Sequence, residues 1–120
     1  MIRIDKNYAL AYYNRGVVKD RLKDYSSANE DYTKSIQLDP KYANAYFNRG
    51  LNKYEKFQDH IGAIADFTNF LRINSNNDKA YYHRGIAKGN VDDMKGACSD
   101  WKKSASLGNK SALEFVKNDC

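Results

Sequence analysis

Residues able to do acid–base, nucleophilic or metal chemistry are few in this sequence, and they are scattered. His60 and His83 stand apart, and neither has a Cys, Asp or Glu at the spacing of metal ligands. The adjacent acids Asp92 and Asp93 fit helix N-cap residues better than an acid–base pair. The sequence has no glycine-rich phosphate loop and no nucleophile-elbow motif. We therefore expect no enzyme activity, no metal site and no cofactor.

The two cysteines, Cys98 and Cys120, do not have the Cys-x-x-Cys spacing of redox or zinc motifs. If the last two helices run antiparallel, one ending near Ser106 and the other starting near Lys110, Cys98 lies within reach of Cys120. A disulfide is then possible in an oxidising compartment. The other interpretation is two small buried thiols, which we favour slightly because the sequence shows no sign of export.

The sequence contains an internal repeat, which predicts the helices that carry these residues. Two sequence blocks each occur three times, at 12–16, 46–50 and 81–85, and at 28–32, 63–67 and 97–101. Steps of 34 and 35 residues separate the copies, which indicates one inserted residue between Gly50 and Ala63. We place that residue in a surface turn near Phe57 and Gln58, because surface loops tolerate insertions.

Each repeat is predicted to form two helices. In the first copy Ala9, Tyr12, Tyr13 and Gly16 recur at helical spacing. The second helices should start after N-cap aspartates, which are Asp24, Asp59, and Asp92 or Asp93. Pro40 follows the point where the first hairpin must end. Glycine and alanine at equivalent positions allow the paired helices to approach closely, and a large aromatic residue fills the space opposite.

This pattern resembles the tetratricopeptide repeat (TPR) family over essentially the whole chain. The aromatic, glycine, alanine, aromatic and proline positions of the family are held in the first copy by Tyr12, Gly16, Ala28, Tyr32 and Pro40. The second copy has Tyr46, Gly50, Ala63 and Phe67, with Ser75 in place of proline, and the third has Tyr81, Gly85, Ala97 and Trp101. The resemblance implies an all-α, right-handed superhelix (α-solenoid) of antiparallel helix hairpins, with a concave groove lined by the first helix of each pair.

We divide the chain, as a single TPR domain, into the tail of a preceding repeat (1–8), repeat one (9–41), repeat two (42–76), repeat three (77–108) and a capping helix (109–120). The opening residues 2–5 match 36–39, so we interpret the chain as part of a longer protein. The first hairpin would then have an uncovered outer face. We expect end-to-end self-association through Tyr8 and Tyr12, which light scattering would detect. At the other end, Phe115 is expected to share the column of Tyr12, Tyr46 and Tyr81.

Two departures from the family pattern recur in all three copies. The residues before the glycines are Arg15, Arg49 and Arg84, and those three places after them are Lys19, Lys53 and Lys88. A charge in a packing position needs a partner, and acids recur in register at Asp31, Asp66 and Asp100. We predict an Arg–Asp ladder between the hairpins. The alternative is a row of basic residues that reaches a ligand.

Helical geometry assigns three rows of side chains to the concave groove, each with an aromatic, an amide or imidazole, and an aliphatic residue. The rows are Tyr13, Asn14 and Val17; Phe47, Asn48 and Leu51; and Tyr82, His83 and Ile86, with Tyr54 and Lys79 beside them. Amides can bond the backbone of an extended peptide while the rings cover its side chains. We therefore predict a protein-interaction scaffold whose partner is a peptide or protein surface. The alternative is an RNA-binding helical-repeat module.

Some TPR proteins bind chaperone C-terminal carboxylates through a clamp of lysines and asparagines with one arginine. By column, Lys79 and Asn48 match this clamp. Tyr13, Val17 and His83 stand where a lysine, an asparagine and an arginine would be needed. We therefore expect a less acidic ligand.

Composition excludes several other classes of protein. The 120 residues carry 20 Lys and Arg against 15 Asp and Glu, a net charge of +5, with charges of both signs dispersed. A hydrophobic share of 42% is too high for a disordered chain. The sequence shows neither an apolar run long enough to cross a membrane nor a signal peptide. Cytoplasmic localisation is the default expectation.

Overall fold

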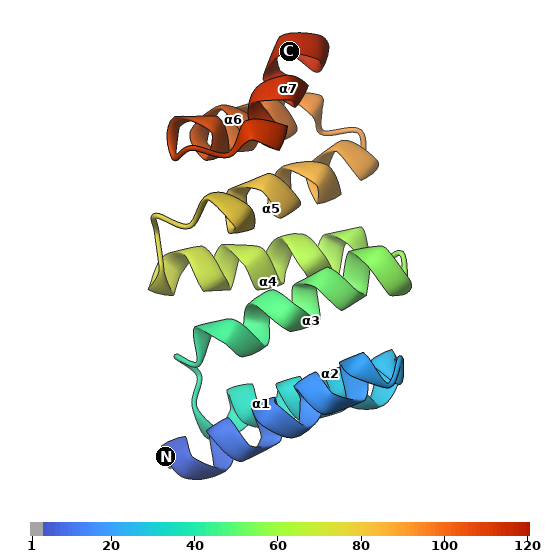
Figure 1. Cartoon of the computed structure of the whole chain (residues 1–120), viewed down its shortest axis with the longest axis vertical. Helices are drawn as coiled ribbons and strands as arrows, with labels where there is room; N and C mark the ends of the chain where they lie inside the picture. Colours follow the sequence, from blue (N-terminus) through green and yellow to red (C-terminus); the bar gives the residue numbers. More distant parts are fainter. Residues whose placement is uncertain (1–3) are drawn as a thin grey trace.

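The computed structural model describes residues 4–120 and within that range consists of seven α-helices joined by short turns. They are α1 (Lys6–Arg21), α2 (Tyr25–Leu38), α3 (Ala43–Lys56), α4 (His60–Ile73), α5 (Asp78–Asn90), α6 (Met94–Ser106) and α7 (Lys110–Asp119). Consecutive helices lie side by side and stack along the long axis of a molecule of 43 × 26 × 23 Å (Figure 1). The predicted all-α solenoid is confirmed. None of the described helices is long and apolar enough to cross a bilayer.

Three helix hairpins, α1–α2, α3–α4 and α5–α6, repeat along the stack, and α7 lies against α6. Each hairpin turn has three residues, and the middle one has a left-handed backbone; these are Lys23, Gln58 and Asp92. The third residue of each turn caps the next helix by accepting a backbone N–H; these are Asp24, Asp59 and Asp93. Asp93, and not Asp92, is therefore the N-cap residue of α6.

The extra residue of the second repeat lies in a helix and not, as we expected, in the turn. All three hairpin turns have the same length, whereas α3 runs one residue further past its glycine than α1 and α5 do. The N–H of Phe57 donates to the carbonyls of both Asn52 and Lys53. Because the bond to Asn52 spans five residues, one more than in an α-helix, the last turn of α3 widens to absorb the insertion.

Close packing within each hairpin depends on a glycine opposite an aromatic ring. A Cβ built on Gly16 would lie 2.6 Å from Cε1 of Tyr32, and one built on Gly85 would lie 2.5 Å from Nε1 of Trp101. Phe67 occupies the same place beside Gly50 and is fully buried. A side chain at Gly16 or Gly85 would clash with the ring opposite, and one at Gly50 would lie tightly against Phe67, so the repeated small residues set the spacing of the array.

The capping helix α7 continues the array as a first helix, but in a register that differs from our expectation. Asn77 caps α5 through the N–H of Ala80, and Asn109 caps α7 through the N–H of Ala112, so α7 follows α5 by 32 residues and not 34. The reason is that α6 and the connection after it are each one residue shorter than α4 and its connection. Phe115 therefore corresponds to His83 and does not share the column of Tyr81.

Cys98 of α6 and Cys120, which directly follows α7, form a disulfide with a Cα–Cα distance of 5.9 Å. The two reduced thiols that we favoured slightly are thus not the state in the structure. The antiparallel packing of α6 and α7 brings the two residues together, as the geometric argument anticipated. The bond fastens the C-terminal end of α7 to the last hairpin.

Part of the predicted repeat tail, Ile2 and Arg3, lies outside the described residues. Asp5 precedes α1 and caps it by accepting the N–H of Tyr8. The N–H of Asp5 donates to the carbonyl of Leu38 at 2.9 Å, which holds the start of α1 beside the end of α2.

Candidate functional site

The predicted groove residues lie on α1, α3 and α5, and they differ in how far water reaches them. Asn14 and Lys79 are exposed, and Tyr54 is buried. The others are half-buried: Tyr13, Val17, Phe47, Asn48, Leu51, Tyr82, His83 and Ile86. Below, "the groove" means the face that these residues form. Tyr54 supports this face from beneath and does not line it.

The three groove aromatics both face outward and pack against neighbouring helices. The Tyr13 ring lies 5.8 Å from that of Tyr32 and 5.2 Å from that of Tyr42, between centroids. The Phe47 ring contacts two rings of α4, Phe67 and Phe70. Each aromatic therefore helps to join two hairpins while leaving part of its ring accessible.

The third groove aromatic, Tyr82, is covered from the C-terminal side by α7. The rings of Tyr82 and Phe115 are stacked, with centroids 5.6 Å apart, and Phe115 also contacts Trp101 at 4.7 Å. These contacts match those of His83 with Phe47 and Phe67 one repeat earlier. The capping helix thus covers one side of Tyr82, which the expected column of Phe115 did not indicate.

His83 is a neutral packing residue of the groove floor. Its Nδ1 lies 2.6 Å from the hydroxyl of Tyr54, and its ring stacks on Phe67. Burial, helped by the nearby charge of Lys79, lowers the pKa of His83 to about 4. His83 therefore supplies no positive charge at neutral pH. Among the described residues, no group of three His, Cys, Asp or Glu side chains is arranged to hold a metal ion.

One groove amide, Asn48, belongs to a hydrogen-bond network that joins the first two repeats. Asn48 donates to the hydroxyl of Tyr13 at 3.2 Å, and Asn52 donates to Asp20 at 2.8 Å. The hydroxyl of Tyr32 also donates to Asp20, and burial with this bond raises the pKa of Tyr32. The sequence analysis did not single out Asp20 or Asn52, because neither recurs in the other copies.

The three arginines that precede the glycines form the predicted ladder. Each makes two hydrogen bonds to the aspartate of its own hairpin, at N–O distances of 2.7 to 3.0 Å. The pairs are Arg15–Asp31, Arg49–Asp66 and Arg84–Asp100. All three carboxylates are buried. Two donors of each guanidinium are therefore committed to an internal pair, in the bidentate geometry that arginine and carboxylate favour.

Each aspartate of the ladder has a second cationic partner, which the sequence analysis did not assign. The Nζ atoms of Lys19, Lys53 and Lys88 lie 3.0 to 3.2 Å from the same three carboxylates. In the first repeat the hydrogen bonds from Arg15, together with Lys19, hold the pKa of Asp31 below its ordinary value. We call each set of arginine, aspartate and lysine a ladder unit.

The ladder also crosses between hairpins. Arg49 donates to the hydroxyl of Thr33 at 2.9 Å, and Arg84 donates to that of Thr68 at 3.2 Å, each on the second helix of the preceding hairpin. Side chains of Arg49 and Arg84 are only 16% exposed, whereas that of Arg15, at the end of the stack, is 59% exposed. Thr33 and Thr68 recur at the repeat spacing, so the sequence carried a signal for this contact between arginine and threonine.

Comparison with known proteins agrees with the repeat and the fold. Residues 9–42 match the family model described as tetratricopeptide repeat. The first TPR of Spaghetti (RPAP3), bound to the HSP90 peptide SRMEEVD, superposes with a TM-score of 0.88 at 24% identity, over 98% of this chain and 94% of that one. The Arabidopsis OM64 TPR domain gives 0.85 at 26% identity over 93% of both chains. No curated protein matches the sequence.

A third solved structure is the second TPR domain of human RPAP3 in complex with the HSP70 peptide SGPTIEEVD. It matches with a TM-score of 0.83 at 28% identity over 92% of both chains. Repeat spacing, hairpin stacking, the family model and these superpositions agree. The first repeat matches the TPR family model, and the described part of the chain has the fold of TPR domains, with three helix hairpins followed by a capping helix.

Proposed function

We propose that this chain is a protein-interaction module that binds a peptide or a segment of a partner protein in the groove. The observation that carries the proposal is the alignment of half-buried aromatic and aliphatic side chains on three successive first helices. Tyr13 and Val17, Phe47 and Leu51, and Tyr82 and Ile86 recur one pair per repeat. Such a surface covers apolar side chains of an extended ligand, and the proposal includes no catalytic step.

The chemistry of the groove favours a ligand less acidic than the chaperone peptides bound by the RPAP3 domains. Tyr13 and Val17 replace two polar or basic clamp positions, and His83 is neutral where the clamp has an arginine. The amide of Asn48, which does match the clamp, is already engaged by Tyr13. Among the predicted groove residues, Lys79 alone offers a positive charge to a ligand carboxylate. The groove rows are likewise not basic, so we do not favour the RNA-binding alternative.

The test is a selection of peptides from a random display library, followed by binding measurements with groove variants. Leu10 and Lys79 lie one helical turn before the groove residues Tyr13 and Tyr82, and both are exposed, so Leu10→Asp with Lys79→Glu changes the edge of the groove without touching the core. We expect the selected peptides to be rich in aromatic and aliphatic residues and to bind this variant about tenfold more weakly, equivalent to about 1.4 kcal/mol.

The matched control is Ile61→Asp with Lys23→Glu, which makes the same chemical changes at exposed positions outside the groove. Equal loss of binding in the control and the groove variant would contradict the proposal. Micromolar binding of the peptide SRMEEVD would overturn the proposed ligand class while leaving the groove as the site.

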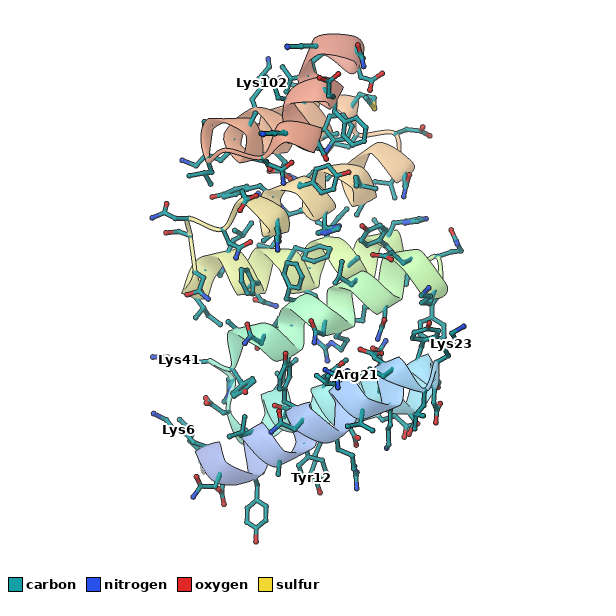
Figure 2. All side chains as sticks on the ribbon, in the orientation of Figure 1. Lys6, Tyr12, Arg21, Lys23, Lys41 and Lys102 are labelled. Atoms are coloured by element: carbon teal, nitrogen blue, oxygen red, sulfur yellow. A yellow bond between two sulfur atoms is a disulfide. The ribbon has the colours of Figure 1, made fainter. Side chains whose placement is uncertain are left out.

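We also keep end-to-end self-association as a proposal. Ala11 is exposed on α1, whereas the equivalent Ala45 and Ala80 are fully buried beneath the preceding hairpin. Tyr12 lies at the same end of the stack (Figure 2), beside a hollow of about 210 Å³. A monomer by light scattering at high concentration would count against the association.

The disulfide bears on the compartment in which the module works. Cytoplasmic thiols are normally kept reduced, whereas Cys98 and Cys120 are bonded in the structure. We therefore propose an oxidising compartment in place of the default cytoplasmic expectation.

A further inference from the structure

The second helices of the three hairpins present a strongly basic surface to solvent. Among the charged residues of α2, α4 and α6 that water reaches freely, one is acidic, Glu30. Five are basic: Lys34, Arg72, Lys95, Lys102 and Lys103. We call the exposed sides of these three helices the second-helix face. It is distinct from the groove, which lies on α1, α3 and α5.

Within the second helices every acid except Glu30 is hidden, whereas the capping aspartates Asp24, Asp59 and Asp93 lie exposed at the start of each helix. Asp31, Asp66 and Asp100 also lie on the second helices, but each is at most 3% exposed. Each is shared between an arginine and a lysine, so every ladder unit carries a net charge of +1 beside the second-helix face. The positive charge of this face therefore gathers in the C-terminal halves of the second helices, at Lys34, Arg72, Lys102 and Lys103.

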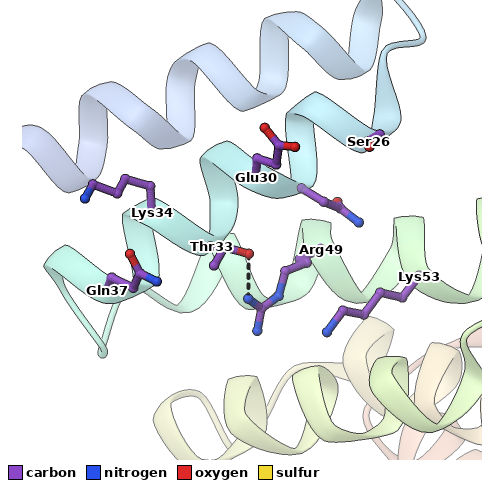
Figure 3. A pocket seen from close by; sticks show the side chains of 8 residues that line it. Ser26, Glu30, Thr33, Lys34, Gln37, Arg49 and Lys53 are labelled. Atoms are coloured by element: carbon purple, nitrogen blue, oxygen red, sulfur yellow. Dashed lines mark hydrogen bonds between the residues drawn. The ribbon is translucent and has the colours of Figure 1, made fainter.

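Two hollows on this face are lined by basic side chains together with hydroxyl or amide groups. The first has a volume of about 380 Å³ and lies between α2 and α3, where Lys34, Arg49 and Lys53 meet Ser26, Thr33, Gln37 and one acid, Glu30 (Figure 3). The second has a volume of about 530 Å³ beside α6, and its lining includes Lys95, Ser99 and Lys102. Lys34 and Lys102 line separate hollows, on the first and third hairpins respectively.

We propose that the second-helix face binds an extended acidic segment of a partner protein. Carboxylate side chains fit the dispersed lysines by charge, and hydroxyl and amide groups in the hollows can bond a peptide backbone. Nucleic acid fits less well, because single strands are held by stacking on aromatic side chains. The described second helices expose no tyrosine, phenylalanine or tryptophan. Tyr25 lies half-buried under the ammonium of Lys56, and the other such rings of these helices are buried.

The test is binding of a fluorescein-labelled oligoglutamate peptide, followed by fluorescence anisotropy at low and physiological salt. Lys34→Glu, Lys102→Glu and Lys103→Glu are combined in one variant, since all three are exposed and outside the ladder. We expect this variant to bind at least about tenfold more weakly than the parent chain. Binding by the parent chain should weaken as salt rises, because exposed charges are screened.

The matched control combines Lys6→Glu, Lys41→Glu and Lys117→Glu, which change the net charge equally at exposed positions off the second helices. It should retain binding within about twofold. Equal losses in both variants would show attraction by net charge alone and overturn the proposal, as would no binding of oligoglutamate at low salt. The parent chain could instead bind single-stranded RNA or anionic vesicles more tightly than oligoglutamate and lose that binding in the same variant. That result would overturn the acidic protein as the partner and indicate nucleic acid or a membrane. The groove variant Leu10→Asp with Lys79→Glu should bind oligoglutamate like the parent chain, which separates this face from the proposed groove function.

Discussion

Replacing Asp66 by asparagine is expected to lower the free energy of unfolding by about 3 kcal/mol, measured by urea denaturation. Asp66 is 2% exposed and accepts two bonds from Arg49 and one contact from Lys53. The substitution keeps the shape of the side chain but removes the charge, so two confined cations lose their partner. Arg49 cannot easily turn to water, because it is also held by Thr33 of the preceding hairpin.

The same substitution at Asp31 provides an internal comparison. Asp31 is as buried as Asp66, but its arginine, Arg15, is 59% exposed and can regain water. We expect Asp31→Asn to cost less than half as much as Asp66→Asn. Glu30→Gln, an exposed charge removal on the same helix as Asp31, should change stability by less than about 0.5 kcal/mol. Equal losses at Asp31 and Asp66 would show that enclosure by the preceding hairpin does not set the strength of a ladder unit.

Removing the disulfide by Cys120→Ser is expected to lower the stability of α7 by about 3 kcal/mol, the usual value for a closed loop of this size. Beyond the disulfide, α7 is held chiefly by buried Ala112 and the ring of Phe115, and a helix this short is marginal by itself. The loss should stay local, because each repeat contacts only its neighbours. Amides of α7 should lose protection from hydrogen exchange while those of α1 to α4 keep it.

Trp101, the only tryptophan in the chain, provides an optical readout for this change. Its ring is in contact with Phe115 at a centroid distance of 4.7 Å. We expect its emission to move to longer wavelength in Cys120→Ser, in Cys98→Ser and in the parent chain with reductant. Ser99→Ala, next to Cys98 and exposed, serves as the control and should leave the emission unchanged. A parent chain whose emission and α7 protection do not respond to reductant would refute the role of the disulfide in holding α7.

Two of the wrong predictions, on Phe115 and Tyr54, share one physical cause, which is that they concern contacts beyond the repeat register. The position of Phe115 followed from the assumption that the spacing stays at 34 residues, but two small shortenings near α6 moved it by two places. Tyr54 was assigned to the groove by helical geometry, but neighbouring side chains bury it. Helical periodicity tells which side of a helix a residue occupies, and it does not tell how much of that side a neighbour covers.

Spacing in the sequence was enough to predict the three hairpins, the capping aspartates of the first two, and the three Arg–Asp pairs. These features depend on spacing within one repeat, and three registered copies fix that spacing. Packing between helices, which spacing does not encode, gives each aspartate a lysine, keeps His83 neutral and stacks Phe115 of α7 on Tyr82. It also decided where the net charge of +5 lies, since the ladder buries three acids and leaves lysines and arginines exposed on the second helices. Composition counts all charges equally, whereas burial determines which of them a partner can meet.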